Sequence, residues 1–121
     1  MKSHTLFFLL SGSVLAVTHY LSLEFSLYWR YVWLDIPMHF LGGATAVFGL
    51  FVLRDLRVNL PQKIYSFYPT MAYVLCIAIA WELFELAAGI PREANYAFDT
   101  TLDLTMGMIG GLTGYGVSKN I

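Results

Sequence analysis

The sequence has little charge and almost no cysteine. Charged residues make up 12% of its 121 residues, about half the share that a soluble domain carries. The net charge of −1 gives no electrostatic footprint for DNA or RNA, which excludes a nucleic-acid binder. The single cysteine, Cys76, excludes an internal disulfide framework and a zinc cluster built from cysteines. The low charge also excludes a soluble enzyme and a disordered linker.

Apolar residues dominate instead: 58% of the chain is hydrophobic, 17% is aromatic, and the mean hydropathy is +0.63. Four apolar stretches, at about 6–28, 34–53, 67–88 and 99–117, are each close to the roughly 20 residues that cross a bilayer as a helix. Helices are required because lipid offers no partner for free backbone N–H and C=O groups. The connections are short, so neighbouring helices should be antiparallel. We predict an all-α fold, an integral membrane four-helix bundle with short loops, forming a single transmembrane domain over 1–121.

The first stretch also has features of a secretory signal. Lys2 precedes an apolar run from Leu6 to Leu10, and Val14-Leu15-Ala16 fits the small-residue pattern of a cleavage site. The apolar character nevertheless continues to Leu27, which is too long for the core of a cleaved signal. We therefore expect a retained membrane helix.

The basic residues predict the orientation of the four spans. The side with both termini and the connection between spans two and three would carry five of them, and the other side only Arg30 and Arg92. The five are Lys2, Arg54, Arg57, Lys63 and Lys119. Because basic residues accumulate on the cytoplasmic side, we expect a multi-pass protein of the cell inner (plasma) membrane with both termini in the cytoplasm. Aromatic residues at 28–33, 96–98 and 65–68 would form the two interfacial belts.

Most of the acidic residues would lie in one layer of this bundle, in the outer half of the membrane. They form pairs three or four residues apart, a spacing that places both members on one face of a helix. With one histidine, the pairs are Asp35 and His39, Glu82 and Glu85, and Asp99 and Asp103. Charged groups in a membrane are costly and face the bundle interior or a wet cavity. The spacing thus predicts a carboxylate-rich pocket that opens toward the outer surface and is closed toward the cytoplasm.

So many carboxylates cannot all be bare anions in a medium of low dielectric constant. Either several are protonated, with Arg30 and Arg92 supplying part of the neutralisation, or a metal ion neutralises them. Oxygen ligands with an imidazole and no thiolate suit Mg²⁺, Mn²⁺, Fe²⁺ or Zn²⁺, and four-helix bundles hold such ions with paired inward carboxylates and histidines. We predict a divalent metal site. Its candidate ligands are Asp35, His39, Glu82, Glu85, Asp99 and Asp103.

Several of these polar residues have simpler interpretations. Asp35 and Asp99 begin their predicted helices and could serve as N-caps. His19 could be a ligand or could hydrogen bond to a neighbour, and Glu24 could join the pocket or lie among the lipid headgroups. Trp81 is interpreted as an anchor or packing residue. Capping does not explain His39, Asp103, Glu82 or Glu85, which lie inside helices.

Glycines predict where helices approach closely. Gly42 and Gly43 follow His39 by one turn, and span four contains the pairs Gly107 with Gly111 and Gly110 with Gly114. Small residues at such spacing let helices pack at short distance in lipid. We expect these glycines to bring spans two and four together, and with them the paired carboxylates.

These residues fall into three blocks in a fixed order: 35–43 (DIPMHFLGG), 81–85 (WELFE) and 99–103 (DTTLD), followed by Gly107 and Gly110-Gly111. The ordered set resembles the YjdF-type family of small bacterial inner-membrane proteins and, more distantly, the VanZ-like proteins. The resemblance covers about 35–111 and not the first span. It implies little about activity, because the YjdF-type family is of unknown function and VanZ-like proteins are associated with glycopeptide resistance. Members of the family are longer, so this chain looks like a minimal version.

Three functions fit the pattern. The first is a metal-dependent membrane hydrolase or transferase acting on a lipid or lipid-linked substrate at the outer leaflet, with Glu82 or Glu85 as the general base. The second is a proton- or cation-coupled transporter, which could form a path as a homo-oligomer. The third is a non-catalytic scaffold whose polar network only fixes the bundle. The inner halves of the spans are apolar, which disfavours a continuous transport path.

Overall fold

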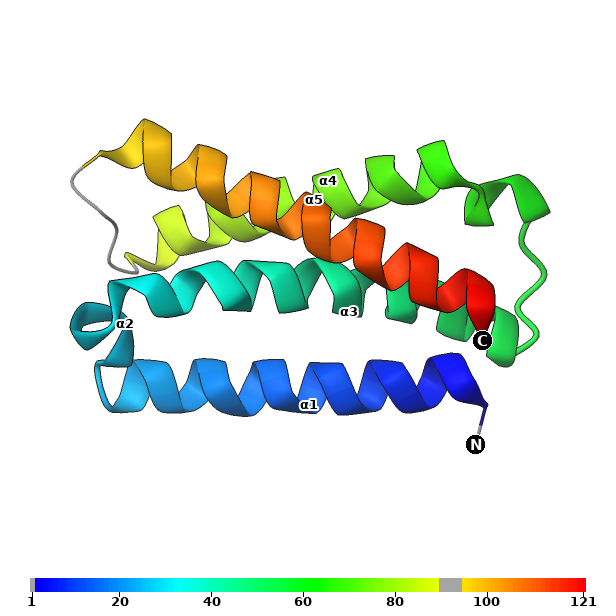
Figure 1. Ribbon diagram of the computed structural model, residues 1–121, viewed down its shortest axis with the longest axis horizontal. Helices are drawn as coiled ribbons and strands as arrows, with labels where there is room; N and C mark the ends of the chain where they lie inside the picture. The colour runs from blue at the N-terminus through cyan, green and yellow to red at the C-terminus, as the bar shows by residue number, and fades with distance from the viewer. Residues whose placement is uncertain (1, 90–94) are drawn as a thin grey trace.

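The computed structural model describes residues 2–89 and 95–121, and these form helices and connecting turns (Figure 1). In chain order the elements are α1 (Ser3–Glu24), α2 (Leu27–Arg30), the 3-10 helix η1 (Val32–Leu34), α3 (Asp35–Asp55), the 3-10 helix η2 (Gln62–Tyr65), α4 (Phe67–Ala88) and α5 (Tyr96–Asn120). No strand occurs in the described ranges. The prediction of an all-α fold is confirmed.

Three helical stretches are long and apolar enough to cross a membrane: Ser3–Glu24, Val32–Asp55 and Phe67–Ala88, with mean hydropathies of 1.7, 1.8 and 1.8. Helix α5 is the longest element, at 25 residues. Its glycines, threonines and two aspartates dilute its apolar character, so length and composition do not place it with the other three. The structure is thus compatible with a membrane protein.

The helix boundaries differ by a few residues from the predicted spans of α1, α3 and α5, and two of these differences have a clear local cause. The first helix ends at Glu24 and not near Tyr28, because Ser26 adopts a left-handed conformation (φ 55°) that turns the chain into α2. The last helix begins at Tyr96, before Asp99. Its N-cap is Asn95, whose side-chain oxygen accepts a hydrogen bond from the backbone N–H of Phe98 at 3.1 Å.

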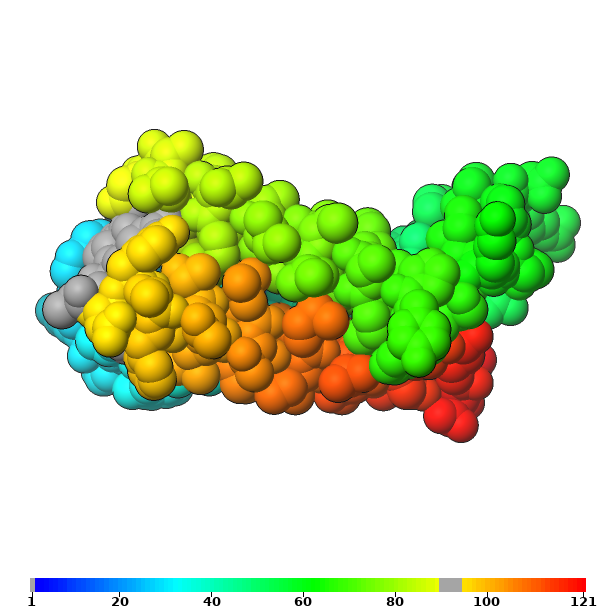
Figure 2. Space-filling view, turned by 90° about the horizontal axis from the view of Figure 1, so that it is seen from above, coloured from blue at the N-terminus to red at the C-terminus, as the bar shows by residue number. Residues whose placement is uncertain are grey.

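Helix α3 is the centre of the bundle. It packs against α1 on one side and against α5 and α4 on the other (Figure 1). Helices α4 and α5 run together along one face, green to yellow and orange to red in Figure 2. The N- and C-termini lie at the same end of the molecule, and α2 lies at the opposite end (Figure 1).

Glycines set the distance between α3 and α5. A Cβ atom on Gly43 would collide with the carbonyl oxygen of Gly107, and one on Gly110 would collide with the carbonyl oxygen of Phe40. The two backbones therefore touch directly, which no larger residue would permit. The prediction that glycines join spans two and four is confirmed at these positions.

Gly42 behaves differently from its neighbour Gly43. A Cβ atom on Gly42 would meet nothing within 4 Å. Packing between helices therefore does not explain this glycine, and that expectation was wrong. A step of one residue turns the helix by about 100°, which places Gly42 on a different face of α3 from Gly43, whose face α5 covers.

The apolar core lies toward the end that holds the termini. Its fully buried members include Val47 and Phe51 of α3 and Val74 of α4. The first turns of α3 lie beyond this core. Polar side chains occupy the bundle interior there.

Candidate metal centre

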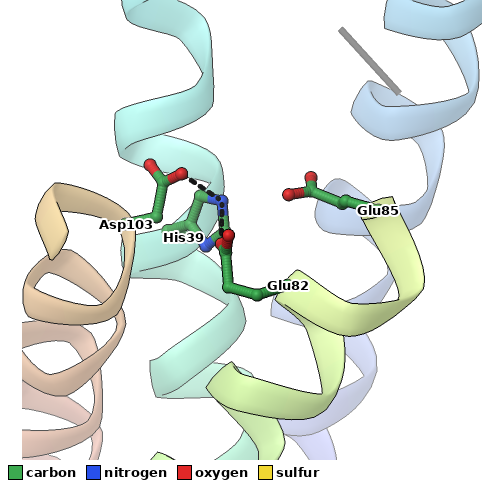
Figure 3. A group of neighbouring side chains, drawn as sticks. All are labelled: His39, Glu82, Glu85 and Asp103. Atoms are coloured by element: carbon green, nitrogen blue, oxygen red, sulfur yellow. Dashed lines mark ion pairs between the residues drawn. The ribbon is translucent and has the colours of Figure 1, made fainter. Parts of the chain in front are cut away.

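The polar residues of three helices converge at one end of the bundle. Because α4 runs antiparallel to α3 and α5, the last turns of α4 lie beside the first turns of the other two (Figures 1 and 3). Each helix contributes one of the pairs that the sequence singled out. The structure therefore brings together all six predicted ligands, Asp35, His39, Glu82, Glu85, Asp99 and Asp103.

His39 lies among carboxylates from all three helices. Its Nε2 atom is 3.4 Å from Asp35 Oδ1 on α3, 3.7 Å from Glu82 Oε1 on α4 and 3.6 Å from Asp103 Oδ2 on α5. Figure 3 shows the carboxyl groups of Glu82 and Asp103 directed at the imidazole ring. Direct hydrogen bonds of this kind would be about 2.7–2.9 Å long. The three carboxylates therefore surround His39 Nε2 at distances longer than those of direct charge-assisted hydrogen bonds.

The cluster is buried. Asp103 is 1% exposed, Glu82 6%, and His39 and Glu85 7% each. His39 Nε2 and Asp103 Oδ1 make no hydrogen bond to any described residue. Buried polar atoms without a hydrogen bond are costly, by about 1–3 kcal/mol each. Within the described residues, the cluster therefore holds buried polar atoms whose hydrogen-bonding capacity is not used.

Two groups of ligand atoms could hold an ion. In the first, one atom from each of His39, Glu82, Glu85 and Asp103 lies within 4.8 Å of all the others. The second consists of Asp35, Asp99 and Asp103, at the same spacing. Asp103 belongs to both groups and has two carboxylate oxygens, so it occupies the centre of the arrangement.

Two side chains orient the glutamates. The indole Nε1–H of Trp81 donates to Glu85 Oε1 at 3.0 Å, and the hydroxyl of Thr100 donates to Glu82 Oε2 at 3.3 Å. The interpretation of Trp81 as an anchor or packing residue was therefore incomplete. Its spacing of four residues from Glu85 was the available signal. Thr100 was part of a recognised block, but its role as a donor to Glu82 was not expected.

His19 and Glu24 lie outside both groups. His19 Nδ1 hydrogen bonds with the hydroxyl of Tyr28 at 2.8 Å, and the His19 ring packs edge-on against Trp81. Burial and the nearby Asp35 and Glu85 carboxyl groups raise the pKa of Tyr28, so this hydroxyl stays protonated. Of the two earlier interpretations of His19, the structure shows the hydrogen bond to a neighbour. Glu24 is exposed at the end of α1.

Capping does not account for Asp35 or Asp99. The N-cap position of α3 is Leu34, and Asp35 makes no capping hydrogen bond there. Asn95 caps α5, and Asp99 lies in its first turn. Both aspartates are near helix N-termini, where the helix dipole favours a negative charge. Arg92, the other cation expected near this end besides Arg30, lies outside the described residues.

A second histidine–carboxylate pair was not anticipated from the sequence. At the end with the termini, His4 Nδ1 lies 3.1 Å from Asp55 Oδ1, and His4 Nε2 lies 3.1 Å from the carbonyl oxygen of Ser118. The backbone N–H and the hydroxyl of Thr5 both donate to Asp55 Oδ2, at 2.9 and 2.8 Å. His4 and Asp55 are 51 residues apart, so no local pattern in the sequence connects them.

Comparison with known proteins does not identify the site: no family model, curated protein or solved structure matches this chain. The resemblance to YjdF-type proteins remains a prediction. The chemistry is therefore inferred from the geometry described above.

Proposed function

We propose that this chain is a four-span protein of the plasma membrane that binds a divalent metal ion in the outer half of its bundle. The ion would serve chemistry on a lipid or lipid-linked substrate at the outer leaflet. Both termini would be cytoplasmic.

Three observations support the four spans. Helix α5 lies along α3 and α4 and is long enough to cross with them, and most of its glycines, together with Asp103, are buried against protein. The two termini lie at one end of the molecule (Figure 1), as an even number of crossings requires. At that end Arg54 lies over the rings of Phe51 and Tyr65, in agreement with a basic cytoplasmic face.

The metal proposal depends on the spacing around His39. Ligand atoms bound to one tetrahedral ion at about 2.1 Å would lie about 3.4 Å apart, close to the 3.4, 3.6 and 3.7 Å measured from Nε2. These separations fit ion pairs with a protonated His39, but they are longer than charge-assisted hydrogen bonds and also suit ligands that share an ion. The 4.8 Å limit of the first group exceeds the span of one coordination sphere, about 4.2 Å, so the four side chains need not all bind one ion as they stand.

The donor set defines the class of ion and its use. Carboxylates with one imidazole suit Mn²⁺, Fe²⁺ or Zn²⁺, and Mg²⁺ if the imidazole is not a ligand. Such an ion would polarise an acyl or phosphoryl oxygen of the substrate.

Glu85, oriented by Trp81, is the candidate general base. It would take a proton from a water molecule as the water oxygen attacks the acyl carbon or the phosphorus atom. The bond to the leaving alcohol would then break, and that alcohol would receive the proton.

Elemental analysis of the purified protein tests the metal site. We expect the wild-type chain, and the His4→Ala variant as a matched control, to carry a divalent metal in stoichiometric amount. His39→Ala and Asp103→Asn should reduce this content by at least about tenfold, because removal even of groups that support ligands costs 10–100-fold in affinity. His4 is the suitable control because it is also a part-buried histidine beside a carboxylate.

The result that would reject the proposal is equally specific. If wild type and His39→Ala contain the same metal, or if neither binds added Zn²⁺ or Mn²⁺, the cluster is a structural network. The scaffold function would then be favoured.

A further inference from the structure

A cavity of about 250 Å³ lies between α1, α3 and α4 and reaches the candidate metal centre. We call it the α1–α4 groove. Residues that line it include Leu15 and His19 of α1, Gly42 and Ala46 of α3, and Ile77 and Trp81 of α4. Its wall is mostly apolar, and its polar lining gathers near one end, where Asp35 and His39 lie.

We propose that the α1–α4 groove binds one hydrocarbon chain of a membrane lipid and holds the headgroup of that lipid beside the carboxylate–histidine cluster. This inference rests on the proposed function, since it requires α1 and α4 to cross a membrane. It adds the way in which a lipid substrate would be positioned.

The floor of the groove is built from small residues. Gly42, Ala46 and Gly49 follow one another at intervals of four and three residues, on one face of α3. A Cβ atom on Gly42 would have no neighbour within 4 Å, so here the missing side chain leaves space. At the far end, the ring of Phe8 comes within 3.0 Å of the position a Gly49 Cβ would take, and this closes the groove.

The groove is long enough to take much of one lipid chain. From His39 to Gly49 it follows α3 for ten residues, about 15 Å at 1.5 Å per residue. This is half of the roughly 30 Å hydrocarbon core of a bilayer. The polar end lies near the first turn of α3, as a headgroup requires, and the closed end at Gly49 lies beyond the midpoint of the span Val32–Asp55.

The groove is accessible from the side. Helix α1 packs on α3, and the α4 residues Ile77 and Trp81 are 42% and 36% exposed. In a membrane the medium beside this opening consists of lipid chains. An apolar cavity filled by a chain regains the dispersion contacts that an empty one lacks. A cavity of 250 Å³ has room for about eight groups of the size of water or methylene, at about 30 Å³ each.

A polar atom at the end of the groove supports a lipid that carries a headgroup. His39 lines the groove, is 7% exposed, and has an Nε2 atom without a hydrogen bond to a described residue. A simple hydrocarbon would leave this atom unpaired. A lipid with an ester or phosphate oxygen at that depth would bring an acceptor, or a ligand for the ion, to the same place.

Photolabelling tests the proposal. The full chain is reconstituted in phosphatidylcholine vesicles containing a trace of a phosphatidylcholine with a diazirine in the middle of one acyl chain, illuminated, and mapped by peptide mass spectrometry. We expect labels on groove residues such as Leu15 and Ile77 in excess over Leu83 and Leu86, which are exposed on α4 away from the groove at 61% and 59%. Gly42→Leu, which fills the groove, should reduce groove labelling several-fold.

Ala46→Leu provides a second variant on the same floor, should Gly42→Leu fold poorly. Gly116→Leu is the matched control, because Gly116 is exposed on α5 and a Cβ there also meets nothing within 4 Å. Labelling spread evenly over outward-facing residues, or groove labelling that neither variant reduces, would overturn the proposal.

Metal content measured on the same samples separates the two proposals. An unlabelled groove in a protein that loses its metal on His39→Ala refutes the lipid chain alone. A labelled groove in a protein whose metal content does not depend on His39 refutes the metal site alone.

Discussion

The bundle places a histidine beside acidic residues at each of its ends, part-buried at His4 and buried at His39, and the two sites differ in how far their hydrogen bonds are satisfied. At the end with the termini, each ring nitrogen of His4 and each carboxylate oxygen of Asp55 has a partner at 2.8–3.1 Å. At the other end, the carboxylate oxygens around His39 Nε2 remain 3.4–3.7 Å away. The first arrangement is complete as it stands. The second has the spacing of a site that receives a ligand.

Burial and residue type therefore do not by themselves identify a functional site. Both sites combine a histidine with aspartate inside a mostly apolar bundle. One ties the N-terminus of α1 to the C-terminal ends of α3 and α5, which is a structural task. The other gathers five carboxylates around one imidazole. Such an excess of negative charge stabilises nothing unless a cation or protons compensate for it.

The largest effect should come from separating the helices that build the His39 site. In Gly110→Leu the new side chain would meet the backbone of Phe40, which cannot move without displacing α3. We expect loss of bound metal together with a marked fall in the midpoint of thermal unfolding in detergent. Gly116→Leu on the same helix should match wild type in both measurements, and equal behaviour of the two variants would contradict the close contact between α3 and α5.

Added metal should stabilise the protein by binding at the His39 site and not at the His4 site. A ligand at 100 times its Kd raises the free energy of unfolding by about 2.7 kcal/mol. We expect thermal unfolding to show this increment for wild type and for His4→Ala, and to lose it for His39→Ala. An increment that disappears in His4→Ala and persists in His39→Ala would reverse the assignment of the two sites.

Neutralising one aspartate in each site should have unequal consequences in metal-free protein. Asp55→Asn removes a carboxylate whose two oxygens are hydrogen bonded, and should lower the free energy of unfolding by about 1–3 kcal/mol. Asp103→Asn removes one charge from a crowded, mutually repelling group and should cost less. Denaturation in chelator measures both, and a greater loss for Asp103→Asn would show that its ion pair with His39 already satisfies the site.

The smallest effect is expected from the two residues that donate hydrogen bonds to the glutamates, Trp81 and Thr100. Trp81→Phe keeps an aromatic ring but removes the donor to Glu85 Oε1. Loss of a group that orients a ligand costs about 10–100-fold in metal affinity, so we expect about tenfold weaker binding by titration with little change in fold. Thr100→Val, which removes the longer hydrogen bond to Glu82, should weaken binding less. An unchanged affinity in both variants would show that these two donors do not support the ligands of the metal.

Much of the fold and of the cluster could be predicted from local patterns. The apolar runs gave three of the long helices, and α4 has the predicted limits. The i, i+3 and i, i+4 spacing put each pair of polar residues on one helix face, and antiparallel helices could then only bring the pairs to the same end. Boundaries were less predictable where one residue decides them, as with the left-handed turn at Ser26 and the Asn95 cap.

Composition and a period of 3.6 residues are enough to predict that the chain is helical and apolar and that its polar pairs each lie on one helix face. Other features are visible only in the folded chain. They include which histidine has a hydrogen-bond partner at each ring nitrogen, which glycines contact the backbone of a neighbouring helix, which glycine leaves space for a groove, and the hydrogen bond from Trp81 to Glu85. The physical reason is that hydrogen bonds and cavities depend on ångström distances between helices that are far apart in sequence. His4 and Asp55 meet across 51 residues, and Gly42 differs from Gly43 only in which helix lies beside it.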